Sequence, residues 1–181
     1  MATSPSTTTQ YASEQFVESC GAILFNLSDS QNKTVCLIHY HAKNEWLLAK
    51  GRRNCGESRH EAALREVREE TGYQAHLHPV RMYTRAPPID EQGQMPDEPR
   101  SYPDLTEPFM VTVRQLGGDG ESNVKIIWWY IATLDEGGFA GSGGSEEEFT
   151  PVFFSLEEAV KKLSFQNDRM VLQKAIALVE T

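Results

Sequence analysis

The chain has 181 residues, a formal net charge of -9 and a sequence pI of about 5.0. This length allows one hydrophobic core and is short for two ordinary domains, so we expect a single domain. The negative charge disfavours non-specific binding to a nucleic acid backbone, so we expect no long nucleic acid as a partner. A phosphate-rich ligand must then be held locally, by a metal ion or a small group of basic side chains.

The N-terminal segment and the cysteines predict a protein of the cytoplasm. Residues 1–15 are rich in Ser and Thr, so we expect a disordered tail followed by one domain over residues 16–181. The start of the chain lacks the basic and apolar regions of a signal peptide, and no stretch approaches the roughly 20 apolar residues that span a bilayer. Cys20, Cys36 and Cys55 lack the paired spacing of a structural zinc site. We therefore expect reduced thiols and no membrane partner.

The predicted elements follow from the pattern of apolar, β-branched, Gly and Pro residues. Residues 58–71 contain no Gly or Pro, and Gly72 supplies a stop, which predicts a helix. Residues 156–179 have helical spacing and predict two helices with a break near residues 164–167. Expected strands cover residues 17–27, 35–39, 46–49, 77–84, 109–116 and 124–134, and another begins at residue 153. The strand at residues 46–49 ends at Lys50-Gly51, and expected loops cover residues 52–56, 86–104 and 137–148.

Strands around a central helix, with helices at the C-terminus, predict a layered α/β domain. Residues 124–134 form a nearly continuous apolar run, which indicates a strand that is buried on both faces. Trp128 and Trp129 are adjacent in this strand and must face opposite sides of the sheet. We expect at most one of them near a functional site, and core packing is the preferred role for both.

The predicted helix at residues 58–71 carries a patch of carboxylates. Glu66, Glu69 and Glu70 are three or four residues apart, which puts their side chains on one face at a spacing of about 5–6 Å. A hard divalent cation relieves such a concentration of negative charge, and Mg²⁺ keeps open positions for water and phosphate oxygens. The alternative is a solvent-facing helix with Glu–Arg pairs, which explains neither Glu57 nor the flanking glycines.

The spacing of these residues resembles the Nudix box. The pattern is Gly51, five residues, Glu57, seven residues, Arg65-Glu66-Val67, one residue, Glu69-Glu70, one residue and Gly72-Tyr73. The flanking strands are compatible with the family's α/β/α sandwich around a mixed central sheet. The resemblance implies a hydrolase that cuts a phosphoanhydride bond with water and uses Mg²⁺ or Mn²⁺. It implies catalytic roles for Glu57, Arg65, Glu66, Glu69 and Glu70, and metal ligation by Gly51, Glu66, Glu69 and Glu70.

Two kinds of residue support this patch. Arg65 precedes Glu69 by four residues, so its guanidinium can pair with Glu57 or Glu69 and fix their orientation. Gly51 and Gly72 are positions where the backbone turns into and out of the helix, and bulkier residues there would displace the carboxylates. Some Nudix enzymes take a proton acceptor from a downstream loop, for which the candidates are Glu107, Glu121 and Glu146 to Glu148.

Basic residues near the motif predict a phosphate-binding surface. Lys50, Arg52 and Arg53 form a basic cluster at the mouth of the expected site in an otherwise acidic protein. Arg85 and Lys125 are further candidates for the same surface. Ordinary surface charge on a loop is the alternative interpretation for each of these residues.

The sequence around the motif favours one class of substrate. Trp46, three residues and Lys50-Gly51 resemble the Nudix branch that acts on diadenosine polyphosphates and diphosphoinositol polyphosphates, although Ala49 stands where that branch commonly has proline. A proline at the position of Pro88 resembles the family's ADP-ribose pyrophosphatases, so an ADP-ribose or nucleotide-sugar pyrophosphatase is the second candidate. A Nudix module that binds nucleotides without turnover is the third. In each case we expect a small, phosphate-rich partner molecule and either a monomer or a homodimer.

Overall fold

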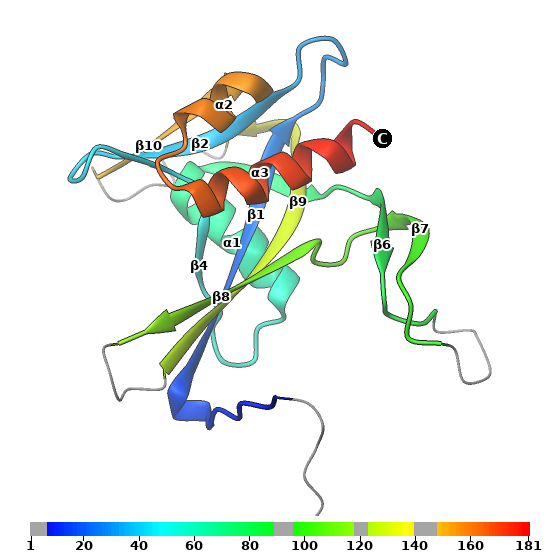
Figure 1. Cartoon of the computed structure of the whole chain (residues 1–181). Helices are drawn as coiled ribbons and strands as arrows, with labels where there is room; N and C mark the ends of the chain where they lie inside the picture. Colours follow the sequence, from blue (N-terminus) through cyan, green and yellow to red (C-terminus); the bar gives the residue numbers. More distant parts are fainter. Residues whose placement is uncertain (1–6, 89–95, 118–122, 140–147) are drawn as a thin grey trace, which may run out of the picture.

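The computed structural model describes residues 7–88, 96–117, 123–139 and 148–181. These residues form an α/β fold in which helices cover both faces of a central sheet (Figure 1). The predicted layered architecture with a mixed sheet is therefore confirmed. The helices are the 3-10 helix η1 (Ser13–Gln15), α1 (Arg59–Thr71), α2 (Leu156–Lys162) and α3 (Gln166–Val179).

The central sheet follows the order β10-β2-β1-β9-β5, with β3 paired to β2, β4 to β1 and β8 to β9. Strands β1 and β9 pair in parallel, and the other pairs are antiparallel, so the sheet is mixed. Its strands are β1 (Phe16–Asn26), β2 (Thr34–Tyr40), β3 (Glu45–Leu47), β4 (Lys50–Arg52), β5 (Tyr73–Leu77), β8 (Met110–Leu116), β9 (Asn123–Phe139) and β10 (Phe149–Ser155). A separate hairpin of β6 (Val80–Thr84) and β7 (Arg100–Leu105) lies beside the sheet (Figure 1).

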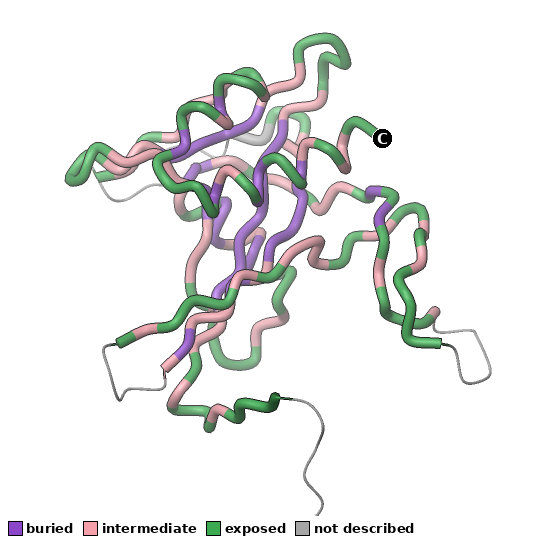
Figure 2. Tube along the Cα trace, viewed as in Figure 1, coloured by how far each residue is buried: buried purple, intermediate pink, exposed green. Residues whose placement is uncertain are grey.

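The core consists of two apolar clusters, one on each face of the sheet. Successive residues of β1 alternate between them, because side chains of a strand point to opposite faces. Leu24 packs with the small residues of α1, whereas Ile23 and Phe25 pack on the side of α2 and α3. Figure 2 shows the buried residues concentrated in the strands between the helices. Strand β9 is buried on both faces as predicted, and Trp129 is in the core on the α3 side.

Several expected boundaries were wrong because pairing between distant segments decides them. Residues 50–52 form a strand of their own, β4, instead of the end of one strand and the start of a loop, since they pair with residues 19–21 of β1. The expected strand at residues 77–84 is two strands that belong to different sheets. Strand β7 lies within the expected loop at residues 86–104, because it pairs with β6. Likewise, β9 continues to residue 139 in the expected loop at residues 137–148.

The predicted tail at residues 1–15 falls partly outside the described residues. Residues 13–15 form η1, and β1 begins at Phe16, where we expected the domain to begin. Within the described ranges, no helix has the length and hydrophobicity needed to cross a membrane. The cytoplasmic location and the oligomeric state stay predictions.

Candidate active site

Helix α1 is capped at both ends, by Ser58 at its N-terminus and by the predicted stop Gly72 at its C-terminus. Ser58 and Glu61 form a capping box, in which the Glu61 carboxylate accepts from the Ser58 amide at 2.9 Å. Gly72 ends the helix with a φ of 73°, a left-handed conformation that favours glycine, and its amide donates to the Arg68 carbonyl at 2.9 Å. These caps fix the residues at which the helix begins and ends.

The inner face of α1 brings Glu66 against strand β4. Ala62, Ala63 and Val67 are fully buried against β1, and these small side chains allow a close approach of helix and sheet. Glu66 follows Ala62 by one turn and is only 8% exposed. A Cβ atom at Gly51 would be 1.9 Å from Glu66 Oε2, so glycine is required where the carboxylate covers the backbone. The predicted proximity of Gly51 and Glu66 is therefore present.

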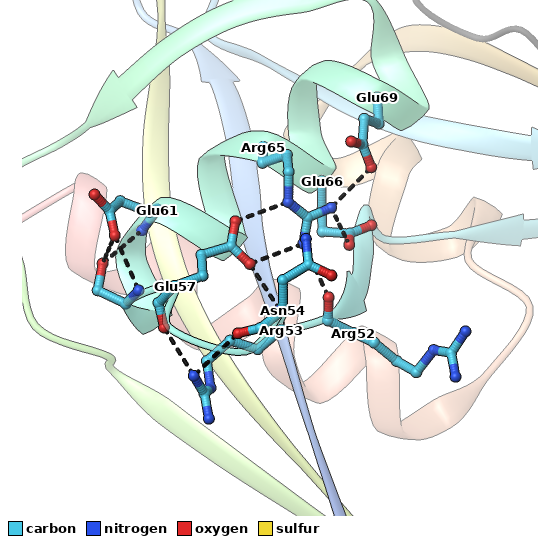
Figure 3. Close-up of polar contacts among 9 residues, drawn as sticks. Arg52, Arg53, Asn54, Glu57, Glu61, Arg65, Glu66 and Glu69 are labelled. Atoms are coloured by element: carbon cyan, nitrogen blue, oxygen red, sulfur yellow. Dashed lines mark hydrogen bonds and ion pairs between the residues drawn. The ribbon is translucent and has the colours of Figure 1, made fainter.

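Glu66, Glu69 and Glu70 are called the acidic patch below. Arg65 connects the loop before α1 with this patch (Figure 3). Its Nε donates to Glu57 Oε1 at 2.7 Å, and its Nη1 donates to Glu66 Oε1 at 2.7 Å and Glu69 Oε2 at 2.8 Å. Its Nη2 donates to the Arg52 carbonyl at 2.9 Å. The hydrogen bond from Arg65 lowers the pKa of Glu57, and these carboxylates raise the pKa of Arg65. Both pairings predicted for Arg65, with Glu57 and with Glu69, are present.

Glu70 also lies beside β4, where its carboxylate bonds to the backbone of the strand. Its Oε2 accepts a hydrogen bond from the Lys50 amide at 2.8 Å. Burial raises the pKa of Glu70 to about 7, although the Lys50 amide opposes this rise. Burial also raises the pKa of Glu66, against the effect of Arg65. Two carboxyl groups beside β4 therefore bind protons more tightly than ordinary surface glutamates.

The acidic patch has the chemistry of a site for a hard cation, but its oxygens do not yet converge. Carboxylate oxygens are the ligands that Mg²⁺ prefers. Within the described part of the chain, no three His, Cys, Asp or Glu side chains form a group ready to hold a metal ion. Arg65 binds Glu66 and Glu69, while Glu70 is turned to the Lys50 amide. Metal binding therefore requires these side chains to rotate from their present partners.

Four basic side chains gather on the α3 side of the sheet, next to this patch. Lys50 lies opposite Gly21 of β1, and Lys125 lies opposite Arg114 of β8. Burial lowers the pKa of Lys125, and the positive charges of Lys50, Arg114 and Arg52 lower it further. Figure 3 shows the Arg52 side chain extending away from Arg65. Lys50, Arg52, Arg114 and Lys125 are called the basic face below.

Arg53 and Arg85, which we expected among the phosphate-binding residues, lie elsewhere. Arg53 Nε donates to Glu18 Oε2 at 3.0 Å, and its Nη1 donates to the Glu57 carbonyl at 2.8 Å, so it supports the loop before α1. Arg85 Nε donates to Asp97 Oδ1 at 2.8 Å at the β6–β7 hairpin. Each guanidinium already has an acidic partner away from the basic face.

Sequence reasoning missed Arg114 and Asp168. The pattern in residues 109–116 predicts a strand but does not identify the strand beside it, so the pairing of Arg114 with Lys125 was hidden. Asp168 lies in the first turn of α3 and is 5% exposed. Burial raises its pKa, which the charges of Lys50 and Arg114 oppose. Asp168 is therefore a buried acid next to the basic face.

The candidates for a separate proton acceptor gain no support from the geometry. Glu107 and Glu148 are exposed, and neither has a described contact with the acidic patch. Glu121, Glu146 and Glu147 lie outside the described residues.

A cavity of about 730 Å³ lies at another part of the sheet, by the C-terminal half of β9. Its lining includes Tyr73, His78 and the paired side chains of His76 and Asp135, whose Nδ1 and Oδ1 atoms are 2.6 Å apart. None of the residues of the acidic patch or the basic face lines it. The clustered ionisable groups, and not this volume, therefore locate the candidate active site.

Comparison with known proteins decides the family. A family model described as NUDIX domain matches residues 19–174. The chain belongs to the Nudix family. All the Nudix box residues described above lie within this match, and the chain is accordingly a Nudix hydrolase, a pyrophosphohydrolase. A search of functionally curated proteins gives no significant match.

Solved Nudix structures share the fold at low sequence identity. A C. elegans Ap4A hydrolase is 17% identical with a TM-score of 0.54, over 90% of this chain and 97% of that chain. A Nudix family hydrolase from Clostridium perfringens is 20% identical with a TM-score of 0.57, over 93% and 99%. The E. coli dihydroneopterin triphosphate pyrophosphohydrolase is 10% identical with a TM-score of 0.52, over 91% and 96%. These likenesses show the fold alone.

Replacing Gly51 by alanine tests the contact that positions Glu66. The new Cβ would overlap the Glu66 carboxylate, so the carboxylate must leave its place under Arg65. We expect Gly51→Ala to weaken binding of a divalent metal about ten-fold or more, as changes around metal ligands commonly do. Titration calorimetry with Mg²⁺ measures the affinity, and thermal unfolding checks that the variant is folded. Unchanged affinity in a folded variant would contradict this role for Gly51.

The raised pKa of Glu70 predicts a pH dependence of stability in the metal-free protein. Its stabilising contribution is complete below the unfolded-state value of 4.5 and is lost as the pH rises through the folded-state value of about 7. In Glu70→Gln this contribution is absent. Between pH 4.5 and 7, we expect the free energy of unfolding of the variant to rise by on the order of 2–3 kcal/mol relative to that of the wild type. Urea unfolding in the presence of a chelator measures this free energy for both proteins. Parallel curves of unfolding free energy against pH would refute the prediction.

Proposed function

We propose that the chain uses Mg²⁺ or Mn²⁺ to hydrolyse a phosphoanhydride bond in a nucleoside diphosphate linked to a second moiety. The proposed substrates are diadenosine polyphosphates and diphosphoinositol polyphosphates. One observation carries this proposal: the basic face lies next to the acidic helix, so cations for several phosphates adjoin carboxylates for a metal. Charge-assisted hydrogen bonds from Lys and Arg are the usual means of holding phosphate.

The acidic patch would hold the metal ion. Glu66, Glu69 and Glu70 are the proposed side-chain ligands, together with the main-chain carbonyl of Gly51. When bound, the ion would neutralise phosphate oxygens and make a coordinated water more acidic. Glu66 lies against Gly51, and Glu70 bonds to the neighbouring Lys50 amide, which supports a site along β4.

The side chains of the protein divide the remaining work. Arg65 orients Glu66 and Glu69 and is the group that must release them when the cation enters. The basic face would bind the phosphates on the α3 side of β4. Burial raises the pKa of Glu70 to about 7 in the metal-free protein, so a cation that binds this carboxylate would displace a proton near neutral pH. Glu57 acts through Arg65 and through the loop before α1.

The number of cations separates the proposed substrates from the second candidate. ADP-ribose and nucleotide sugars carry two phosphates, whereas diadenosine tetraphosphate and diphosphoinositol polyphosphates carry more. The four residues of the basic face therefore favour the longer phosphate chains. Pro88 is partly buried, and among the described residues no contact joins it to the acidic patch. The module without turnover is disfavoured because every carboxylate of the motif is retained.

A substrate panel tests the proposed reaction. The purified protein is incubated with Mg²⁺ and diadenosine tetraphosphate, a diphosphoinositol polyphosphate, ADP-ribose or a capped dinucleotide. We expect turnover of one of the first two, and a loss of several orders of magnitude in Glu66→Gln because the metal would lose an anionic ligand. Chromatography with phosphate analysis identifies the products. Preferred turnover of ADP-ribose would favour the second candidate, and turnover of nothing would favour the binding module.

Neutralising the basic face tests how the phosphates are bound. Each of Arg114→Ala and Lys125→Ala removes one charged contact worth about 1.5–3 kcal/mol, so we expect kcat/KM to fall roughly ten- to hundred-fold. The loss should come chiefly from a higher KM, because neither residue belongs to the proposed metal site. Arg85→Ala is the control, since Arg85 pairs with Asp97 at the hairpin. Equal effects of all three substitutions would contradict the assignment of the basic face.

A further inference from the structure

Glu18 of β1 lies outside the Nudix box but contacts the start of the loop before α1 and the first residue of α1. Its Oε2 accepts from Arg53 Nε at 3.0 Å, and its Oε1 accepts from Arg59 Nε at 2.9 Å and Nη2 at 2.7 Å. Trp128 Nε1 donates to the same Oε1 at 2.9 Å. The Arg53 amide also donates to the Glu18 carbonyl at 3.0 Å. Glu18 thus joins β1, β9, the loop and the first turn of α1.

The surroundings of this side chain require a carboxylate. All four groups that bond to it are N–H donors, so both of its terminal atoms must accept hydrogen bonds. A glutamine would turn an NH₂ donor toward one of these donors. The Glu18 side chain is 12% exposed, and the Arg59 guanidinium lies 4.1 Å from the centre of the Trp128 ring. Surface ion pairs rarely have so many well-placed partners.

A continuous series of hydrogen bonds connects Glu18 with the acidic patch. Arg53, held by Glu18, donates to the Glu57 carbonyl at 2.8 Å. The Glu57 carboxylate accepts from Arg65 Nε at 2.7 Å, and Arg65 donates to Glu66. The Asn54 amide donates to Glu57 Oε2 at 2.9 Å, which ties the loop to the same carboxylate. A change in the position of Arg53 therefore reaches Glu66 through Glu57 and Arg65.

We propose that Glu18 is a positioning residue of the hydrolase, which fixes the loop at residues 53–58 and with it Arg65, so that Glu66 and Glu69 are held beside the proposed metal site. It acts from the α1 side of the sheet, opposite the basic face, and touches neither the proposed phosphate sites nor the proposed metal ligands. Its effect on the reaction rests on the proposed function, whereas its effect on the loop does not.

Glu18→Gln tests this role because it keeps the size of the side chain and removes one acceptor. We expect kcat to fall about ten- to hundred-fold and the Mg²⁺ concentration for half-maximal rate to rise by a similar factor, as for other supports of metal ligands. KM at saturating Mg²⁺ should stay within about three-fold of the wild type, because the basic face is untouched. A role limited to stability would lower the melting temperature and leave kcat and the Mg²⁺ dependence of the folded protein unchanged, which would overturn the proposal.

Glu157→Gln is the matched control. Like Glu18→Gln, it replaces a glutamate by glutamine and breaks an ion pair. This ion pair, with Lys161, lies on the exposed surface of α2. We expect no change in kcat, KM or Mg²⁺ dependence, and a loss equal to that of Glu18→Gln would overturn the proposal. Arg53→Lys is the second variant if Glu18→Gln does not fold. It retains the charge, but one ammonium cannot replace the guanidinium contacts with Glu18, Asn54 and Glu57, so the same pattern is expected.

Hydrogen exchange provides a measurement that needs no substrate. In the metal-free protein, we expect amides of residues 53–58 and the first turn of α1 to exchange faster in Glu18→Gln than in the wild type, while β2 and β10 remain protected. Equal exchange in the loop would overturn the positioning role even if activity fell. If the wild type turns over no member of the substrate panel, the proposed reaction fails, and faster exchange would still support the attachment of the loop by Glu18.

Discussion

The guanidinium of Arg65 is the constraint on which the candidate site depends. It binds three carboxylates, those of Glu57, Glu66 and Glu69, together with the Arg52 carbonyl (Figure 3). One positive charge among three negative ones leaves an excess of negative charge beside β4. The planar arrangement of five donors allows these contacts to be made at once, which an ammonium could not do. Arg65 therefore orders the acidic patch and leaves it with a net negative charge.

Strand β4 contributes to both the acidic patch and the basic face, although it has only three residues. Its three residues alternate, so that Gly51 lies under the Glu66 carboxylate while Lys50 and Arg52 belong to the basic face. The backbone contributes as well, because the Lys50 amide donates to Glu70 and the Arg52 carbonyl accepts from Arg65. Acidic and basic groups are kept apart by the thickness of one strand. The site therefore depends on the pairing of β4 with β1.

Local sequence features predicted α1 and its contacts well. The Gly72 stop and the spacing of the glutamates are signals within one helix, and the pairing of Arg65 with Glu69 follows from their separation by one turn. The approach of Gly51 to Glu66 followed from the motif. The contacts of residues outside the helix were harder to predict, because they depend on which strands are neighbours in the sheet.

The errors have the same origin. Three residues of β4 carry too little pattern to identify a strand, and only the pairing with β1 defines it. Arg114 joins the basic face because β8 lies next to β9, whereas Arg53 is adjacent to the motif in sequence but faces Glu18. Proximity along the chain was a poor guide to proximity across the sheet.

The parallel pairing of β1 with β9 has a consequence for how the protein is made. These strands lie more than a hundred residues apart in the chain, since Phe16 pairs with Val124. Bringing such distant segments together slows folding relative to forming local contacts. During synthesis, the complete acidic helix leaves the ribosome long before β9 supplies Lys125 and the Trp128 partner of Glu18. A nascent chain thus carries the entire Nudix box while β1 still has an unpaired edge, a stage at which association with other chains is a hazard.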